Sequence, residues 1–379
     1  MAAAGDRRVK TLRLGVAAAV VDGAIVPGDV SIADERIAEV GLRPAGGGTA
    51  VPGLIDLQVN GFGGVDFLTD ADDEAWRQAA ERLRAAGVTA FQPTLITAPP
   101  AAVREALERA ARLQQAAGAG ARILGVHLEG PFLAPKRLGT HPAEHRREPD
   151  LRLLRDYLGR GPVTMLTLAP ELDGAWALVD ELADRGVVVS LGHSVASAAV
   201  ADAAFDRGAR AVTHVLNAMS PIAAREPGLA GAALARDDVT VLSIVDGVHL
   251  AEDTVRLVWR AAAGRLAVTS DAIAAAAMGD GAYALGTVRV EVRDGRATSA
   301  GGAIAGGVGT VADALRRLVE LGAPLEQAVA AATGIPARLL GRDDVGTLRP
   351  GARADIAVLD GELLVERVLL AGADREAVA

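Results

Sequence analysis

Histidine and carboxylate side chains directly follow several short apolar segments of this chain. His127 and Glu129 end one such segment, His193 and His214 follow two others, and Asp271 follows the last. Two imidazoles and one carboxylate form a three-ligand set that leaves a coordination position open, which is typical of a catalytic divalent metal. Such a metal lowers the pKa of a coordinated water to about 7. Glu129, His193 and His214 are therefore candidate metal ligands, and Asp271 is the candidate proton acceptor.

The elements that must position these residues are eight apolar segments, most of them separated by helix-like stretches. The segments lie at residues 54–59, 88–95, 122–128, 163–168, 187–191, 211–214, 240–245 and 266–270. This alternation is typical of parallel strands with crossover helices and predicts a (β/α)8 TIM-type barrel, whose active site lies at the C-terminal ends of the strands. A doubly wound sheet is the alternative, but the glycines at 61–64 lack the phosphate-loop spacing.

Both ends of the chain carry short apolar segments broken by turn residues. Residues 1–52 predict a small β-meander, and residues 345–379 return to β character after the turn at Gly346–Gly351. We expect the two ends to form one small β-sandwich domain, with the metal-dependent barrel at residues 53–344.

The composition excludes several classes of function. With 48 acidic and 39 basic residues, a net charge of -9 and no cysteine, the chain cannot form disulfides or Cys-type zinc sites. An acidic protein is a poor general ligand for nucleic acid or anionic membranes, so we expect neither partner. Residues 14–21 are too short and interrupted for a convincing signal peptide, and Asp22–Gly23 suits a hairpin turn. A cytoplasmic location is expected.

The sequence contains a set of motifs that occur together in one known family. They are Pro52–Gly61, Pro93–Thr97, His127–Phe132, Gly139–Pro142, Leu168–Glu171, Gly192–Ser194, Thr213–His214, Asn217–Gly231, Asp246–His249 and Ser270–Ala272. In their order and spacing, from about residue 50 to 360, the chain resembles the N-acetylglucosamine-6-phosphate deacetylases, a branch of the amidohydrolase superfamily.

This resemblance implies roles for individual residues. Glu129, His193 and His214 would bind the metal, and Asp271 would act as general base and then as general acid. His141 would polarise the acetyl carbonyl of the substrate, an amino-sugar phosphate that releases acetate. The substrate-binding set would be Thr140, His141, Asn217, Ala218, Arg225 and His249.

Within this set, Asn217 and Ala218 would contact the sugar, whereas Arg225 and His249 would hold the phosphate. Arg225 would reach across from a second subunit, which implies a homodimer. A different interpretation of Arg225 is an ion pair with its neighbour Glu226 on a solvated loop.

Strand one and strand four indicate how many metals are bound. Gln58 and Asn60 stand where many members of the superfamily have the His-x-His pair of a second metal, and amides are poor ligands for transition metals. The fourth strand, at 163–169, has no lysine that could bridge two metals. We therefore expect one divalent ion per chain, with zinc as the first candidate.

Two alternatives stay open on the sequence alone. The substrate could be the galactosamine epimer, or the chain could be a non-catalytic barrel that binds a sugar phosphate. One loop, Ala305–Thr310, also departs from the family pattern, and it would face the bound sugar or serve as a flexible turn before a helix.

Overall fold

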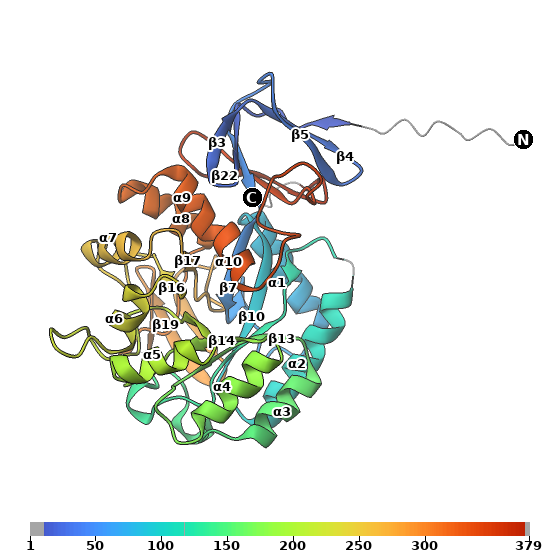
Figure 1. Cartoon of the computed structure of the whole chain (residues 1–379). Helices are drawn as coiled ribbons and strands as arrows, with labels where there is room; N and C mark the ends of the chain where they lie inside the picture. Colours follow the sequence, from blue (N-terminus) through green and yellow to red (C-terminus); the bar gives the residue numbers. More distant parts are fainter. Residues whose placement is uncertain (1–10, 117, 376–379) are drawn as a thin grey trace, which may run out of the picture.

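A nearly closed ring of eight parallel strands forms the centre of the computed structural model, which describes residues 11–116 and 118–375 (Figure 1). The predicted TIM-type barrel is confirmed. Its strands are β7 (Leu54–Val59), β10 (Val88–Ile96), β12 (Val126–Glu129), β13 (Val163–Leu168), β14 (Val188–Leu191), β15 (Ala209–Val212), β16 (Thr240–Ile244) and β17 (Leu266–Thr269).

Helices surround this ring, most of them on its outside. They are α1 (Asp73–Ala85), α2 (Pro100–Gln115), α3 (Leu151–Arg160), α4 (Ala175–Asp184), α5 (Ala198–Asp206), α6 (Gly228–Ala235), α7 (Glu252–Ala261), α8 (Val311–Glu320), α9 (Leu325–Ala332) and α10 (Gly334–Leu339). Side-chain caps define several starts: the hydroxyl of Ser197 accepts a hydrogen bond from the backbone of Val200, so α5 begins at Ala198. Short 3-10 turns at Pro135–Arg137 and Ala143–His145 lie in the loop after β12.

One predicted strand differs from the structure. Residues 122–128 form two pieces, β11 (Arg122–Ile123) and β12, which both pair with β10. Gly125 separates them with a φ of 120°, and a side chain at this position would collide with Thr164. The break therefore follows from a close approach of two strands that only glycine permits.

Two apolar layers hold the barrel together. The larger lies between strands and helices, and a smaller one fills the barrel interior and packs against α10, which contributes Ile335, Ala337 and Leu339. Because α10 covers the N-terminal ends of the strands, the opposite, C-terminal ends are left for polar side chains.

Both chain ends contribute to a six-stranded sheet beside the start of β7. Its order is β23-β22-β21-β6-β2-β3, and Ile356 on β21 pairs with Pro52 on β6. The strands are β2 (Ala18–Val21), β3 (Ala24–Pro27), β6 (Thr49–Pro52), β21 (Ile356–Leu359), β22 (Val365–Leu370) and β23 (Ala373–Arg375). A three-stranded sheet packs with it over a shared apolar core: β1 (Leu12–Arg13), β4 (Asp29–Ala33) and β5 (Arg36–Leu42). The domain boundaries at residues 52/53 and 344/345 stay a prediction.

Short antiparallel strands extend two loops at the C-terminal end of the barrel. They are β8 (Gly61–Phe62) with β9 (Val65–Asp66), and the sheet of β18 (Gly281–Leu285), β19 (Val288–Arg293) and β20 (Arg296–Ser299). The buried Asp66 carboxylate joins them by accepting a hydrogen bond from Gly286 at 2.8 Å. The second sheet is thereby held over the barrel mouth.

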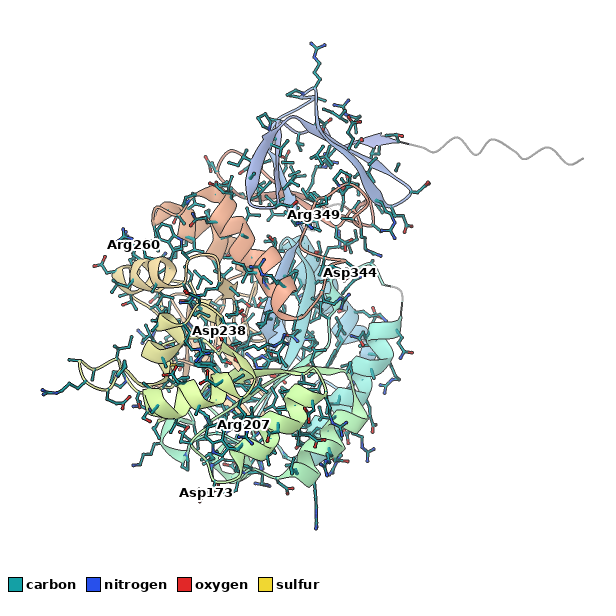
Figure 2. The ribbon with its side chains drawn as sticks, viewed as in Figure 1. Asp173, Arg207, Asp238, Arg260, Asp344 and Arg349 are labelled. Carbon is teal, nitrogen blue, oxygen red and sulfur yellow. The ribbon has the colours of Figure 1, made fainter. Side chains whose placement is uncertain are left out.

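The surface is densely charged, as the side chains in Figure 2 show. Arg207 pairs with Asp180 at 2.6 Å, and Arg349 pairs with Asp22 at 2.6 Å. Such exposed pairs contribute little to stability, so the apolar cores carry most of it. In the described part of the chain, no helix combines the length and apolar character needed to cross a membrane.

Candidate active site

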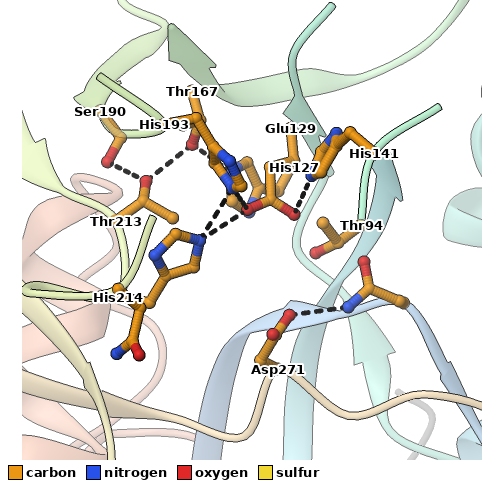
Figure 3. A network of polar contacts seen from close by, with 12 residues as sticks. Thr94, His127, Glu129, His141, Thr167, Ser190, His193, Thr213, His214 and Asp271 are labelled. Carbon is orange, nitrogen blue, oxygen red and sulfur yellow. Dashed lines mark hydrogen bonds and ion pairs between the residues drawn. The ribbon is translucent and has the colours of Figure 1, made fainter. Parts of the chain in front are cut away.

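Three side chains from three strand ends converge at the C-terminal mouth of the barrel. Glu129 ends β12, His193 follows β14 and His214 follows β15, and all three are buried. One ligand atom from each lies within 4.8 Å of the others. The Nε2 atoms of His193 and His214 lie 3.0 and 2.8 Å from Oε1 of Glu129 and 3.2 Å from each other (Figure 3).

The hydrogen bonds of His193 fit a metal ligand. Its Nδ1 lies 2.7 Å from the carbonyl oxygen of Arg137, which can only accept, so Nδ1 carries the proton. The Nε2 lone pair is then free to point at an ion in the centre of the cluster. This donor set of two imidazoles and a carboxylate suits a divalent ion.

A ladder of hydroxyl groups lies directly beneath these ligands. His127 Nε2 contacts Thr167 Oγ1 at 2.7 Å, Thr167 contacts Thr213 at 2.7 Å, and Thr213 contacts Ser190 at 2.6 Å. All four side chains are fully buried and come from β12, β13, β14 and the end of β15 (Figure 3). The ladder therefore connects the three strands whose ends carry Glu129, His193 and His214.

His141 enters the site from the long loop after β12. Its Nε2 lies 3.6 Å from Glu129 Oε2, and its Nδ1 lies 3.3 Å from the backbone nitrogen of Thr97. That N–H donates to Nδ1, so in the neutral ring the proton sits on Nε2, which faces the site. His141 is thus set up as a hydrogen-bond donor.

Asp271 follows β17 on the opposite side of the cavity from His193 (Figure 3). The amide nitrogen of Asn60 donates to its Oδ1 at 2.8 Å. Burial, and then the negative charge of Glu129, raises the pKa of Asp271 to about 6. This carboxylate is a stronger base than an ordinary aspartate.

The charge balance of the cluster affects each of its members differently. Burial opposes ionisation of Glu129, but the three imidazoles of His141, His193 and His214 around it outweigh burial and hold its pKa well below the usual range. Burial, and then His141, lowers the pKa of His193, which favours the neutral imidazole that a metal requires. Burial is the largest of the causes that lower the pKa of His127 to about 4.

A cavity of about 240 Å³ joins these groups. Its lining includes the predicted metal ligands and Asp271, together with Thr140, His141, Asn217, Ala218 and His249. The loop with the unusual sequence also reaches it through Gly306. The imidazole Nδ1 of His249 is held by Asp246 Oδ2 at 2.7 Å.

Arg225 is the one predicted site residue that lies outside this cavity. It is exposed on the segment between β15 and α6, which projects from the side of the barrel (Figure 1). The pairing with Glu226 considered from the sequence is not formed, because the Glu226 carboxylate instead accepts hydrogen bonds from the backbone of Ala198 at 2.7 Å and Gly228 at 3.0 Å.

Among the lining residues that the sequence analysis missed are Leu285, at the end of β18, and Ala303 and Ile304, from the segment after β20. The signal was the alternating pattern of 281–299 around the turn at Asp294–Gly295. It predicts a hairpin but not its contact with the barrel mouth.

Comparison with known proteins places these observations in a family. The amidohydrolase family model matches residues 49–376. The N-acetylgalactosamine-6-phosphate deacetylase of Escherichia coli O157:H7 is 38% identical over 325 residues, covering 85% of this chain and 86% of that protein. The N-acetylglucosamine-6-phosphate deacetylase of Mus musculus is 37% identical over 356 residues, covering 90% of this chain and 85% of the relative.

A solved structure agrees with this assignment over nearly the whole chain. The N-acetyl-D-glucosamine-6-phosphate deacetylase of Mycobacterium smegmatis, an aspartate-to-alanine mutant in complex with N-acetyl-D-glucosamine-6-phosphate, superposes with a TM-score of 0.90 at 37% identity. The match covers 96% of this chain and 99% of that one. The chain therefore belongs to the amidohydrolase family, in the branch that contains the N-acetylglucosamine-6-phosphate deacetylases.

Proposed function

We propose that this protein hydrolyses the acetamide of N-acetylglucosamine 6-phosphate to glucosamine 6-phosphate and acetate. The observation that carries the proposal is the convergence of Glu129, His193, His214 and Asp271 on one cavity. The identity to relatives named for this reaction supports the substrate class. A barrel that only binds a sugar phosphate has no use for a carboxylate with a raised pKa beside a metal site.

Glu129, His193 and His214 would hold one divalent ion, with zinc as the first candidate. When bound, the ion supplies a Lewis acid that polarises the acetyl carbonyl and lowers the pKa of a water molecule. The second metal ion that other amidohydrolases bind is not supported here, because Gln58 and Asn60 offer amides in place of imidazoles.

The protein's own groups would move the protons. Asp271 accepts a proton from the attacking water as the new C–O bond forms, and it returns that proton to the amide nitrogen as the C–N bond breaks. His141 donates from Nε2 to the carbonyl oxygen, where negative charge develops. Asn217 and Ala218, which line the same cavity, would contact the sugar, and Thr140 lies beside His141.

The phosphate requires a cation that one chain does not place in its own cavity. No lysine or arginine is present among the described residues that line it, and the lining residue that we assign to the phosphate is His249. Arg225 is exposed, and it forms no ion pair within the described residues. We therefore propose a homodimer in which Arg225 of one subunit completes the phosphate site of the other.

The galactosamine epimer is the second candidate substrate, because the relative from Escherichia coli O157:H7 is named for it at a similar identity. The test is acetate release from both N-acetylhexosamine 6-phosphates, with kcat/KM measured before and after chelation and after zinc is restored. We expect faster turnover of the gluco epimer, abolished by the chelator and recovered with zinc. Absence of acetate from either sugar in the zinc-loaded protein would refute the proposed function.

A further inference from the structure

Asp56 lies beneath the active site and has no part in the chemistry proposed above. Its side chain is 1% exposed. Oδ1 accepts hydrogen bonds from Thr269 Oγ1 at 2.7 Å and from the backbone nitrogens of Gln58 and Ser270 at 3.2 Å each, and Oδ2 accepts from the Ser270 hydroxyl. A buried carboxylate is costly unless it is fully hydrogen-bonded, and here every partner is a donor.

These bonds join the first and last strands of the barrel. We call the junction between β7 and β17 the barrel seam. No strand ladder is formed there in the described residues, and a single backbone bridge pairs Val59 with Ala272. The contacts of Asp56 with Thr269 and Ser270 therefore replace part of the missing ladder.

Asp271 has an unusual backbone conformation, and hydrogen bonds hold the backbone on both sides of it. Asp271 has a φ of 50°, in the left-handed region that residues other than glycine seldom adopt. On one side of it, the Ser270 hydroxyl donates to Asp56 and accepts a hydrogen bond from the Ala272 backbone at 3.0 Å. On the other side, the Asp271 carbonyl accepts from Gly307 at 2.8 Å. Such a conformation persists only where its surroundings enforce it.

We infer that Asp56 is a positioning residue for the proposed proton carrier: through the Ser270 hydroxyl it holds the turn 270–272 and thereby aims the Asp271 carboxylate at the cavity. The inference rests on the proposed function. The side-chain amide of Asn60, four residues after Asp56, donates directly to the Asp271 carboxylate. The segment that begins with β7 therefore holds both the backbone and the side chain of Asp271.

The alternative is that Asp56 only closes the barrel seam. Two neighbouring substitutions separate these roles, because each removes one hydroxyl that donates to Asp56. Thr269→Val removes a bond across the seam and leaves the turn intact, whereas Ser270→Ala removes the hydroxyl that also accepts from Ala272. A seam role predicts equal effects on activity, and a positioning role predicts that only Ser270→Ala lowers kcat.

The experiment compares Asp56→Asn, Ser270→Ala and Thr269→Val in the zinc-loaded protein, measuring kcat, KM, metal content and melting temperature. Misplacement of a catalytic group by about 1 Å can reduce the rate about 10²-fold. We expect losses of about that size in kcat for Asp56→Asn and Ser270→Ala, with KM and metal content nearly unchanged, and a kcat close to wild type for Thr269→Val. Equal kcat values for Ser270→Ala and Thr269→Val would overturn the inference.

A double-mutant comparison tests whether Asp56 acts through Asp271. Adding Asp56→Asn to Asp271→Asn should cause little further loss, because the group that Asp56 positions has already lost its function. A further loss as large as in the wild-type background would also overturn the inference. If Asp271→Asn alone keeps normal turnover, it is the proposed function that fails. If Asp56→Asn does not fold, the Ser270 and Thr269 pair still decides.

Discussion

Arg225→Ala tests both the substrate class and the assembly of the site. Its guanidinium can grip a phosphate through two parallel hydrogen bonds, and bonds to charged groups contribute roughly 1.5–3 kcal/mol each. Two such bonds amount to about 3–6 kcal/mol, which corresponds to about 10²–10⁴-fold in kcat/KM. Because the cavity has no lysine or arginine among the described residues of its lining, no neighbouring cation compensates for the loss.

The assay measures kcat/KM for N-acetylglucosamine with and without its 6-phosphate, in the wild type and in Arg225→Ala. We expect the wild type to prefer the phosphorylated sugar by about 10²–10⁴-fold. The variant should lose most of this preference while it keeps its metal, since Arg225 lies outside the metal cluster. Comparable values for both sugars in the wild type would show that the phosphate site is wrongly assigned.

Hybrid dimers test whether Arg225 acts across the subunit interface. A dimer of one Arg225→Ala chain and one Asp271→Asn chain contains one complete site, made from the intact Asp271 of the first chain and the intact Arg225 of the second. We expect this hybrid to recover activity that neither homodimer has. An inactive hybrid, after both chains are shown to be present, would refute the contribution in trans.

Three further predictions follow from the site and its supports. Wild-type protein reconstituted with excess zinc and then desalted should keep one equivalent of zinc per chain, and two retained equivalents would contradict the single site. His193→Ala should keep no zinc, while its melting temperature changes little. Thr213→Val should weaken zinc binding in a chelator competition and Thr213→Ser should restore it, because a hydroxyl is needed at the centre of the ladder; equal affinities would show that the ladder does not support the ligands. Hydrogen bonds from the ring and backbone of His249 overcome burial and lower the pKa of Asp246 to about 2. The ionised Asp246 therefore stabilises the folded protein by about 2 kcal/mol above about pH 4, and this stabilisation is lost as the pH falls toward 2. In Asp246→Asn, the free energy of unfolding should accordingly depend less on pH in this range than it does in the wild type.

The sequence predicts the barrel and the metal ligands well because both depend on local patterns. The apolar segments at 163–168 and 54–59 coincide with β13 and β7. Parallel strands bring their C-terminal ends to one face, so residues that follow the strands must meet whatever the side-chain details are. Glu129, His193 and His214 could be grouped for this reason before any distance was known.

Contacts between distant segments could not be predicted in this way. Thr213 contacts Thr167 and Ser190 across strands whose relative register the sequence does not reveal. Leu285 enters the cavity because the turn after it is bound to Asp66, a contact between segments 220 residues apart. The position of Arg225 could not be predicted for the same reason, because the substrate phosphate that it would bind lies in the site of another subunit.

The backbone of the site explains why its supports are so extensive. His193, His214 and Asp271 have φ values of 49°, 28° and 50°, so three of the four groups assigned to the metal and the proton lie in the left-handed region. This conformation directs each side chain sharply off its strand end toward the cavity, but it is unfavourable for these residues in isolation. The hydroxyl ladder beneath the two histidines and the bonds of Asp56 beneath Asp271 lie where this strain must be balanced. The polar side chains inside the barrel near the C-terminal ends of its strands are therefore best understood as the framework that keeps the catalytic groups in place.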